Sequence, residues 1–470
     1  MSEDKDGLYS EEEINSAVNR FKEFTKSGRD CYFDVFEYEG IIDYFFEHNM
    51  IKKASVAIDL ADKQHPYSVS LRVKKAQLCI YKGQAQEAIL ILNLAEKLER
   101  NNIDIYILKG NALLLLDKPN EAEKQFDAVI KTSTEDLGRI LNDIAFAYEQ
   151  SGYFKFALKY FKKALKLDPQ NGSLLYDIAF CYEKTHLSEK SILYYNKYLK
   201  EYPFSKNAWH NLANQYYETE EFDKAIEAYD FAIAIDPDFI NAFFNKANCL
   251  NEAEKYAEAI KTYKEILLTE SDNPVVYTYI GECYERLNDY KKAIDNYNLA
   301  LDNDNEFSDA WFGIGLVKLF EEKYFESISY VKKAIKFNSS NSEYYYALGN
   351  VNTKLGFTKD ALIAYKDAID NDPEDVGSWL ASAEIMFKQG EMEKAINFLE
   401  SGYDITKEYA NINYRLATYH FLKDNKTQGL KYFTSGLKQN FDEHLKVLKD
   451  IPDKNTISEI QNLINKLNKK

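Results

Sequence analysis

Residues 209–238 read WHNLANQYYETEEFDKAIEAYDFAIAIDPD, and this stretch is the most informative part of the sequence about the fold. It holds two amphipathic runs that are joined by a short acidic turn, and it ends in Asp-Pro. Each run has the apolar spacing of a helix that buries one face. Because proline cannot continue a helix, the Asp-Pro pair marks where the second run must stop. The stretch therefore predicts a helix–turn–helix unit.

The unit recurs with a period of 34 residues along most of the chain. WHNLANQYYE at 209 aligns with FFNKANCLNE at 243 and YTYIGECYER at 277, and KAIEAYDFAI at 224 aligns with EAIKTYKEIL at 258 and KAIDNYNLAL at 292. Residues 35–443 divide into twelve such repeats, with one extra residue, Leu137, between the third and the fourth. The repeats begin at residues 35, 69, 103, 138, 172, 206, 240, 274, 308, 342, 376 and 410. A fixed period of this length is typical of a solenoid.

Three positions within the repeat explain how the helices pack. Position 8 is Ala or Gly in eleven of the twelve repeats, and position 20 is Ala, Ser or Gly in all twelve. Position 24 is always large and apolar, as in Phe126, Tyr195 and Tyr297. Two helices approach closely only where side chains are small, and a bulky neighbour one turn along fills the groove beside the contact. Prolines share one position just after the second helix: Pro66, Pro169, Pro203, Pro237 and Pro373.

This pattern resembles the tetratricopeptide repeat (TPR), and the resemblance covers 409 of the 470 residues. It implies an all-α fold in which about twelve antiparallel helix pairs stack into a right-handed superhelical solenoid. The first helix of each pair is expected to line a concave groove, and twelve repeats should make more than one superhelical turn.

The flanks are expected to cap the array, because a solenoid needs terminal elements with a polar outer face. Residues 1–34 hold an acidic segment and a helix with a capping box at Ser10 and Glu13, which Gly28 would end. Residues 444–470 repeat the capping signal at Thr456 and Glu459 and end in the basic NKLNKK. Both segments carry an apolar stripe. One of them could instead be a separate docking element.

The bulk composition narrows the class of partner. The net charge is −17 and the pI is near 5.0, which disfavours nucleic acid because phosphate binding depends on Lys and Arg. Five cysteines without CxxC spacing argue against a disulfide framework or a zinc site. The polar N-terminus is no signal peptide, and no apolar window could span a membrane. We expect a soluble cytoplasmic protein with no membrane insertion.

The sequence holds no signature of catalysis. It lacks a phosphate-binding glycine loop, a dinucleotide fingerprint and a nucleophile elbow. The six histidines are far apart and lack metal-ligand spacing. Cys181, Cys249 and Cys283 share repeat position 10, which favours packing over a nucleophile. The sequence therefore predicts no enzyme, no cofactor and no metal.

In the TPR family, positions 2, 5, 6, 9, 12 and 13 of the first helix tend to face the groove. In repeats 6 and 7 these positions include Asn207, His210, Asn211, Asn214, Tyr217, Phe244, Asn245 and Asn248. A carboxamide both donates and accepts, so a ladder of asparagines could bind the main chain of an extended peptide. Some TPR proteins resemble this arrangement. The alternative is that Asn is merely tolerated here.

Five glutamates follow the same face in repeats 4 to 8: Glu149, Glu183, Glu218, Glu252 and Glu285. They fall at positions 12 or 13, in the last turn of the first helix, where the helix dipole disfavours an anion. This placement suggests binding of a basic segment, although glutamates that keep an exposed turn soluble would look the same. The carboxylate clamp of chaperone-binding TPR proteins is not expected, because Lys74 is the only cation at positions 2, 5, 6 and 9 of repeats 1 to 3.

The sequence thus predicts a non-enzymatic scaffold that binds a segment of a partner protein, with the basic extended peptide as the sharper hypothesis. A regulatory subunit of an enzyme complex would use the same groove. Homo-oligomeric assembly through apolar residues at the ends is a further alternative, and the oligomeric state stays open. RNA binding is disfavoured by the acidic groove.

Overall fold

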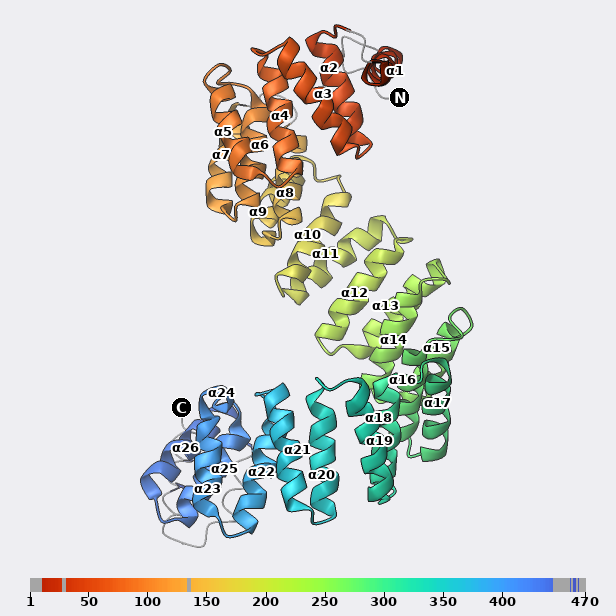
Figure 1. The fold of residues 1–470 in the computed structure, drawn as a ribbon, viewed down its shortest axis with the longest axis vertical. Coiled ribbons are helices and arrows are strands. Elements are labelled where there is room, and N and C mark those ends of the chain that lie inside the picture. Colours follow the sequence, from red (N-terminus) through yellow and green to blue (C-terminus); the bar gives the residue numbers. More distant parts are fainter. Residues whose placement is uncertain are drawn as a thin grey trace. The chain divides into compact units, whose positions relative to one another are not determined.

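The computed structural model describes residues 11–27, 31–132 and 137–442, together with residues 457, 460, 461 and 464. Within these residues the fold is all-α, with 26 helices and no strand (Figure 1). The chain divides into two compact units, residues 1–238 and residues 239–470. Each unit is a solenoid of helix pairs, as the repeats predict. The predicted capping signals at Ser10 and Thr456 lie outside the described residues, as does the predicted stop at Gly28.

Unit 1 contains an N-terminal helix followed by six helix pairs. Its helices are α1 (Glu11–Ser27), α2 (Val35–Glu47), α3 (Ile51–Gln64), α4 (Val69–Tyr81), α5 (Ala85–Glu96), α6 (Ile103–Leu115), α7 (Pro119–Thr132), α8 (Leu137–Gln150), α9 (Phe154–Leu167), α10 (Ser173–Lys184), α11 (Ser188–Glu201), α12 (Lys206–Glu218) and α13 (Phe222–Ile235). The first helices begin within one residue of the predicted repeat starts.

Unit 2 contains six further pairs. Its helices are α14 (Ile240–Glu252), α15 (Tyr256–Ile266), α16 (Pro274–Arg286), α17 (Tyr290–Asn303), α18 (Ser308–Phe320), α19 (Tyr324–Phe337), α20 (Ser342–Lys354), α21 (Thr358–Asn371), α22 (Val376–Lys388), α23 (Met392–Ser401), α24 (Tyr403–Thr406), α25 (Ala410–Leu422) and α26 (Lys426–Gln439). Every first helix starts at its predicted residue. Gly402 separates α23 from the short α24, so the second helix of this repeat is interrupted.

The three packing positions behave as the sequence predicts. Every residue at positions 8, 20 and 24 is buried. A Cβ atom built on Gly281 would lie 2.6 Å from the ring of Tyr297, and one built on Gly349 would lie 2.4 Å from the ring of Tyr365. The side chain at position 24 therefore packs directly on the small residue at position 8, and the two helices of a pair meet there.

A tight turn ends the first helix of every repeat. Three residues join the two helices of each pair, and the residue at repeat position 15 has a positive φ in all twelve repeats. In the first repeat, the N–H of Asn49 donates to the carbonyl of Phe46 and the N–H of Met50 donates to the carbonyl of Phe45. This is the Schellman pattern, which satisfies carbonyls that the helix end would leave without a partner.

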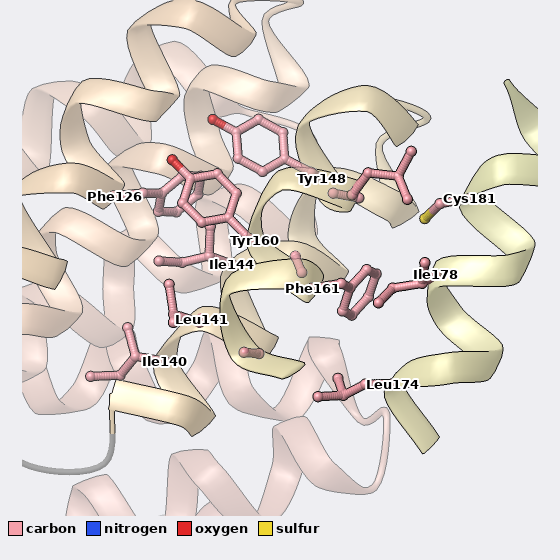
Figure 2. Close-up of a cluster of buried hydrophobic side chains, with 14 of the residues drawn as sticks. Phe126, Ile140, Leu141, Ile144, Tyr148, Tyr160, Phe161, Leu174, Ile178 and Cys181 are labelled. Carbon is pink, nitrogen blue, oxygen red and sulfur yellow. The ribbon is translucent and has the colours of Figure 1, made fainter. Parts of the chain in front are cut away.

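The core runs through each unit between neighbouring repeats. Figure 2 shows a cluster in unit 1 to which side chains of α8, α9 and α10 contribute. Tyr148 and Tyr160 stack with ring centroids 5.6 Å apart, and Phe161 lies beside Ile178. Since each repeat completes the core of the next, stability depends on nearest-neighbour contacts.

Both ends of the repeat array pack against flanking residues. Phe21 of α1 is buried among Phe33, Tyr38 and Phe45, with ring centroids 5.8 to 6.4 Å away. At the other end, Ile460 and Ile464 are buried in the cluster that contains Phe433 and Leu437. These contacts fit the role of caps. The division into a cap at 1–34, repeats at 35–443 and a cap at 444–470 remains a proposal.

Candidate peptide-binding surface

Tyrosines at position 24 connect the buried core to the face of the first helices. Five repeats carry tyrosine there, and each hydroxyl hydrogen-bonds a polar side chain at position 9 or 12 of the first helix of the same repeat. The pairs are Tyr195 with Glu183, Tyr229 with Asn214, Tyr263 with Asn248, Tyr297 with Glu285, and Tyr365 with Asn350. The donor–acceptor distances are 2.5 to 3.0 Å. These bonds fix the rotamers of polar residues that face the first-helix surface.

The structure shows what the predicted asparagine ladder contacts within the protein. The side-chain oxygens of Asn214 and Asn248 each accept a hydrogen bond from a tyrosine hydroxyl. The NH2 groups of the two asparagines take no part in these bonds. Asn211 donates to the hydroxyls of Tyr176, at 3.0 Å, and Tyr195, at 3.2 Å. Asn207 is exposed, and Asn245 is half-buried. Asn207, Asn211 and Asn214 belong to unit 1, whereas Asn245 and Asn248 belong to unit 2.

The predicted aromatic and histidine residues are half-buried within the array. The Nδ1 atom of His210 lies 3.4 Å from the side-chain oxygen Oδ1 of Asn211, and burial lowers the pKa of the His210 imidazole. Tyr217 packs against Phe222, with ring centroids 5.8 Å apart. Phe244 of α14 lies 5.4 Å from the ring of Tyr279 on α16. The Phe244 contact places the first helices of repeats 7 and 8 side by side.

The five glutamates do not form one row. Glu149, Glu183 and Glu285 stand at position 12 and are partly buried. Glu218 and Glu252 stand at position 13 and are exposed. Apolar residues follow the same rule, since Leu114 at position 12 is buried and Leu115 at position 13 is 54% exposed. One residue along a helix turns the side chain by about 100°, so position 12 faces neighbouring repeats and position 13 faces solvent.

Unit 1 gathers three carboxyl groups on α8 and α10. Burial, together with the negative charge of the nearby Glu149, raises the pKa of Asp177 to about 7. Burial also raises the pKa of Glu149. Glu183 accepts from the Tyr195 hydroxyl and pairs with Lys184 at 3.0 Å. One of the three carboxylates therefore already has a cationic partner.

Unit 2 holds a second cluster of carboxyl groups, which is centred on α16. Burial raises the pKa of Glu285 to about 7, and burial together with repulsion from Glu285 raises the pKa of Glu282 to about 7. Asp309 on α18 and Glu343 on α20 add negative charge near Glu282. The guanidinium of Arg286 lowers the pKa of both carboxyls, but among the described residues it forms no ion pair with either. Desolvation of these anions is thus poorly compensated inside the protein.

Sequence reasoning missed Asp177, Glu282 and the five tyrosines of position 24 as parts of this surface. A signal for the tyrosines was present in the aligned repeats. Each repeat with tyrosine at position 24 carries Asn or Glu at position 9 or 12. Repeat 9 has Val331 at position 24, and it carries Leu316 at position 9 and Leu319 at position 12. No comparable pattern marks Asp177, because its burial depends on how α8 and α10 pack.

Three further features considered in the sequence are a carboxylate clamp, a metal site and a membrane-spanning helix. Lys74, the one cation at the positions that a carboxylate clamp would use, pairs with Asp43 at 2.5 Å. Within the described ranges no three or more His, Cys, Asp or Glu side chains are placed to hold a metal ion. Nor does any helix of that part of the chain combine the length and apolar character needed to cross a membrane.

Four segments match models of the tetratricopeptide repeat: residues 138–171, 207–239, 276–307 and 346–411. The chain is a tetratricopeptide repeat protein. The matches coincide with repeats 4, 6 and 8 and with repeats 10 and 11 together. The TPR array indicates a scaffold for protein–protein interaction. No curated protein matches the sequence.

Several solved structures resemble the chain at low sequence identity. A tetratricopeptide repeat protein from Parabacteroides merdae is 14% identical, covers 53% of this chain and 98% of its own, and has a TM-score of 0.44. Yeast Tom70 is 12% identical, with coverage of 94% and 95% and a TM-score of 0.45. The MamA protein is 18% identical, with coverage of 36% and 92% and a TM-score of 0.31. None of these is similar enough to say what this chain binds.

Proposed function

We propose that this TPR protein is a non-enzymatic scaffold whose first-helix surface in unit 2 binds an extended, Lys- or Arg-containing segment of a partner protein. The observation that carries the proposal is the pair Glu282 and Glu285. These carboxyls are partly buried and lack an ion pair among the described residues. A cationic side chain from a partner would offset the desolvation that raises their pKa.

Neighbouring side chains supply the other contacts that an extended segment needs. Phe244, Tyr263 and Tyr279 form an aromatic wall near Glu282, with the rings of Tyr263 and Tyr279 stacked 5.6 Å apart. Such a wall suits the aliphatic stem of Lys or Arg and permits cation–π contact. Asn245 and Asn248 are proposed to hydrogen-bond the backbone of the segment. In unit 1, Glu149, Asp177 and Glu183 would form a weaker site, because Lys184 already pairs with Glu183.

The structure also changes which glutamates the proposal depends on. Glu218 and Glu252 were grouped with the others in the sequence, but both are exposed. Exposed ion pairs contribute little, about 0–1 kcal/mol. We therefore assign the main electrostatic contribution to the partly buried Glu282 and Glu285 and a minor one to the exposed Glu218 and Glu252.

The test uses a fluorescein-labelled peptide with alternating Lys and Ala residues and measures fluorescence anisotropy. We expect the double variant Glu282→Gln, Glu285→Gln to weaken binding about tenfold, because two buried charges are lost. Glu218→Gln with Glu252→Gln is the matched control, since it removes the same charge from exposed sites. Raising the pH from 6 to 8 should strengthen binding to the wild type, as more of the two carboxyls ionise.

Two results would overturn the proposal. Equal losses in both double variants would mean that the peptide responds only to net charge. Unchanged affinity in the Glu282 and Glu285 variant would remove the site from unit 2. A regulatory subunit remains a compatible role, because it would use the same surface to hold its enzyme.

A further inference from the structure

A pocket with four lysines in its lining, in contrast to the carboxyl-rich first-helix surface, lies at the N-terminal end of unit 1. It has a volume of about 360 Å³ and lies between the last turns of α1 and the first turns of α3. The lining residues are Phe21, Lys22, Thr25, Lys26, Phe45, Lys52, Lys53 and Val56. No part of the first-helix surface of repeats 4 to 8 contributes to it, so it is a separate candidate site.

The floor of the pocket is apolar. Phe21 and Phe45 are buried, with their ring centroids 5.9 Å apart. Val56 stands beside them and is 46% exposed. An exposed valine next to two phenylalanines leaves apolar surface in contact with water, and covering it would be favourable. The floor is therefore suited to a large apolar side chain.

The rim of the pocket is cationic. Lys22 and Lys26 lie one turn apart on α1, and Lys52 and Lys53 open α3. Among the described residues none of the four forms an ion pair, whereas Lys75 of α4 pairs with Asp62 at 2.7 Å. Four lysines without an ion pair in the described ranges surround one pocket, although the chain has a net charge of −17 and Lys53 has only the sulfur of Met50 as a hydrogen-bond acceptor there.

Local contacts account for only part of this arrangement. Lys22 lies over the ring of Tyr44 at 5.0 Å, and Lys53 lies over the ring of Phe45 at 5.9 Å. Lys26 also suits the last turn of α1, where the helix dipole favours a cation. Lys52 has no such benefit, because it follows the N-terminus of α3, where the dipole is positive and Met50 gives no side-chain cap. Positive potential is thus concentrated on this side.

We propose that the pocket binds an acidic peptide segment of a partner protein that inserts one large apolar side chain and places carboxylates on both sides of it. The cations stand on two helices that flank the apolar floor, so a ligand needs separated negative charges around an apolar centre. A single-carboxylate amphiphile would satisfy one side only. The volume is at the lower end of the range for ligand pockets, about 300–1,000 Å³, and suits one or two side chains.

The test measures anisotropy of a fluorescein-labelled peptide with the sequence Gly-Glu-Glu-Phe-Glu-Glu-Gly and the full-length protein. The double variant Lys26→Glu, Lys52→Glu should weaken binding about tenfold, because the rim becomes repulsive. The matched control is Lys63→Glu with Lys97→Glu, two exposed lysines that lie outside the pocket. Val56→Asn should also weaken binding, while Leu90→Asn, at a site that is 67% exposed on α5, should not.

Changes in the peptide separate this proposal from its rivals. Replacement of Phe by Ser should weaken binding, and so should replacement of all four Glu by Gln. Absence of binding, or equal losses in the two lysine variants, would overturn the proposal. Displacement of the peptide by micromolar dodecanoate, with no dependence on the peptide's glutamates, would overturn it in favour of an amphiphile site.

Discussion

Repeats 8 and 9 are neighbours in unit 2 and share one backbone design, yet they fill its key positions differently. Position 24 is Tyr297 in repeat 8 and Val331 in repeat 9, and both pack on a glycine at position 8. Position 12 is Glu285 in repeat 8 and Leu319 in repeat 9. The hydroxyl of Tyr297 donates to Glu285 at 2.7 Å, while Val331 has no polar atom to satisfy.

In this array, the packing between the two helices of a repeat can stay the same while the polar residues on the first-helix surface change. The small-to-large contact between positions 8 and 24 is present in both repeats and holds the helix pair together. The polar pair is added only where the first-helix surface carries carboxylates or carboxamides. A repeat can therefore lose its polar pair without losing its fold, which makes the two repeats internal controls for each other.

The largest expected effect comes from emptying position 24. Tyr297 is fully buried and its ring lies against both Gly281 and Gly313. Tyr297→Ala should destabilise repeat 8 by about 3–5 kcal/mol, because a large cavity remains. Val331→Ala removes less volume and should cost about 2 kcal/mol in repeat 9. Hydrogen exchange of residues 274–303 and 308–337, followed by mass spectrometry, measures both losses, and equal losses would contradict this account.

A second prediction concerns pH. The pKa of Glu282 and Glu285 is raised to about 7, above the ordinary 4.5 that the unfolded chain would have. The folded state therefore binds more protons, so the stability from these groups is fully present below pH 4.5 and is lost as the pH rises through 7. We expect the free energy of unfolding to fall by about 2–3 kcal/mol between pH 6 and pH 8.

The measurement is urea denaturation followed by circular dichroism at the two pH values. Glu282→Gln with Glu285→Gln should remove most of the pH dependence, since glutamine does not ionise and its carbonyl can still accept from Tyr297. Glu252→Gln replaces an exposed carboxyl of the same unit and is the control. A pH dependence that survives the double substitution would show that other groups cause it.

The sequence predicted the packing more completely than the surface. Positions 8, 20 and 24 were found because side-chain size is constrained wherever two helices touch. Glu149 and Glu218 were placed in one row because a sequence does not show which neighbouring helix covers each side of a turn. The lysine pocket was missed because its residues come from separate helices, α1 and α3. Its charge becomes visible only when α1 is packed beside α3.

The positive φ at position 15 was also missed, because the residue there varies. Repeat 8 has Asn288 with φ 58° and repeat 9 has Glu322 with φ 59°. Asparagine tolerates this left-handed conformation better than glutamate does. Glu322→Gly should therefore stabilise repeat 9 by about 0.5–1 kcal/mol, while Asn288→Gly should change repeat 8 by only a few tenths. Thermal unfolding would show the order, and a larger gain from Asn288→Gly would refute it.

The smallest expected effect is at position 20, where repeat 9 has Ser327 and repeat 8 has Ala293. The buried hydroxyl of Ser327 donates to the carbonyl of Gly315 at 2.7 Å and adds a bond between the two helices of the pair. Ser327→Ala should cost only about 0.5 kcal/mol, since the carbonyl keeps its helical partner and alanine fits this position elsewhere. Ala293→Ser should leave the free energy of unfolding nearly unchanged, because the new hydroxyl can donate to the backbone carbonyl of Gly281 in the same way. A cost above about 2 kcal/mol for either change would mean that position 20 does more than allow close approach.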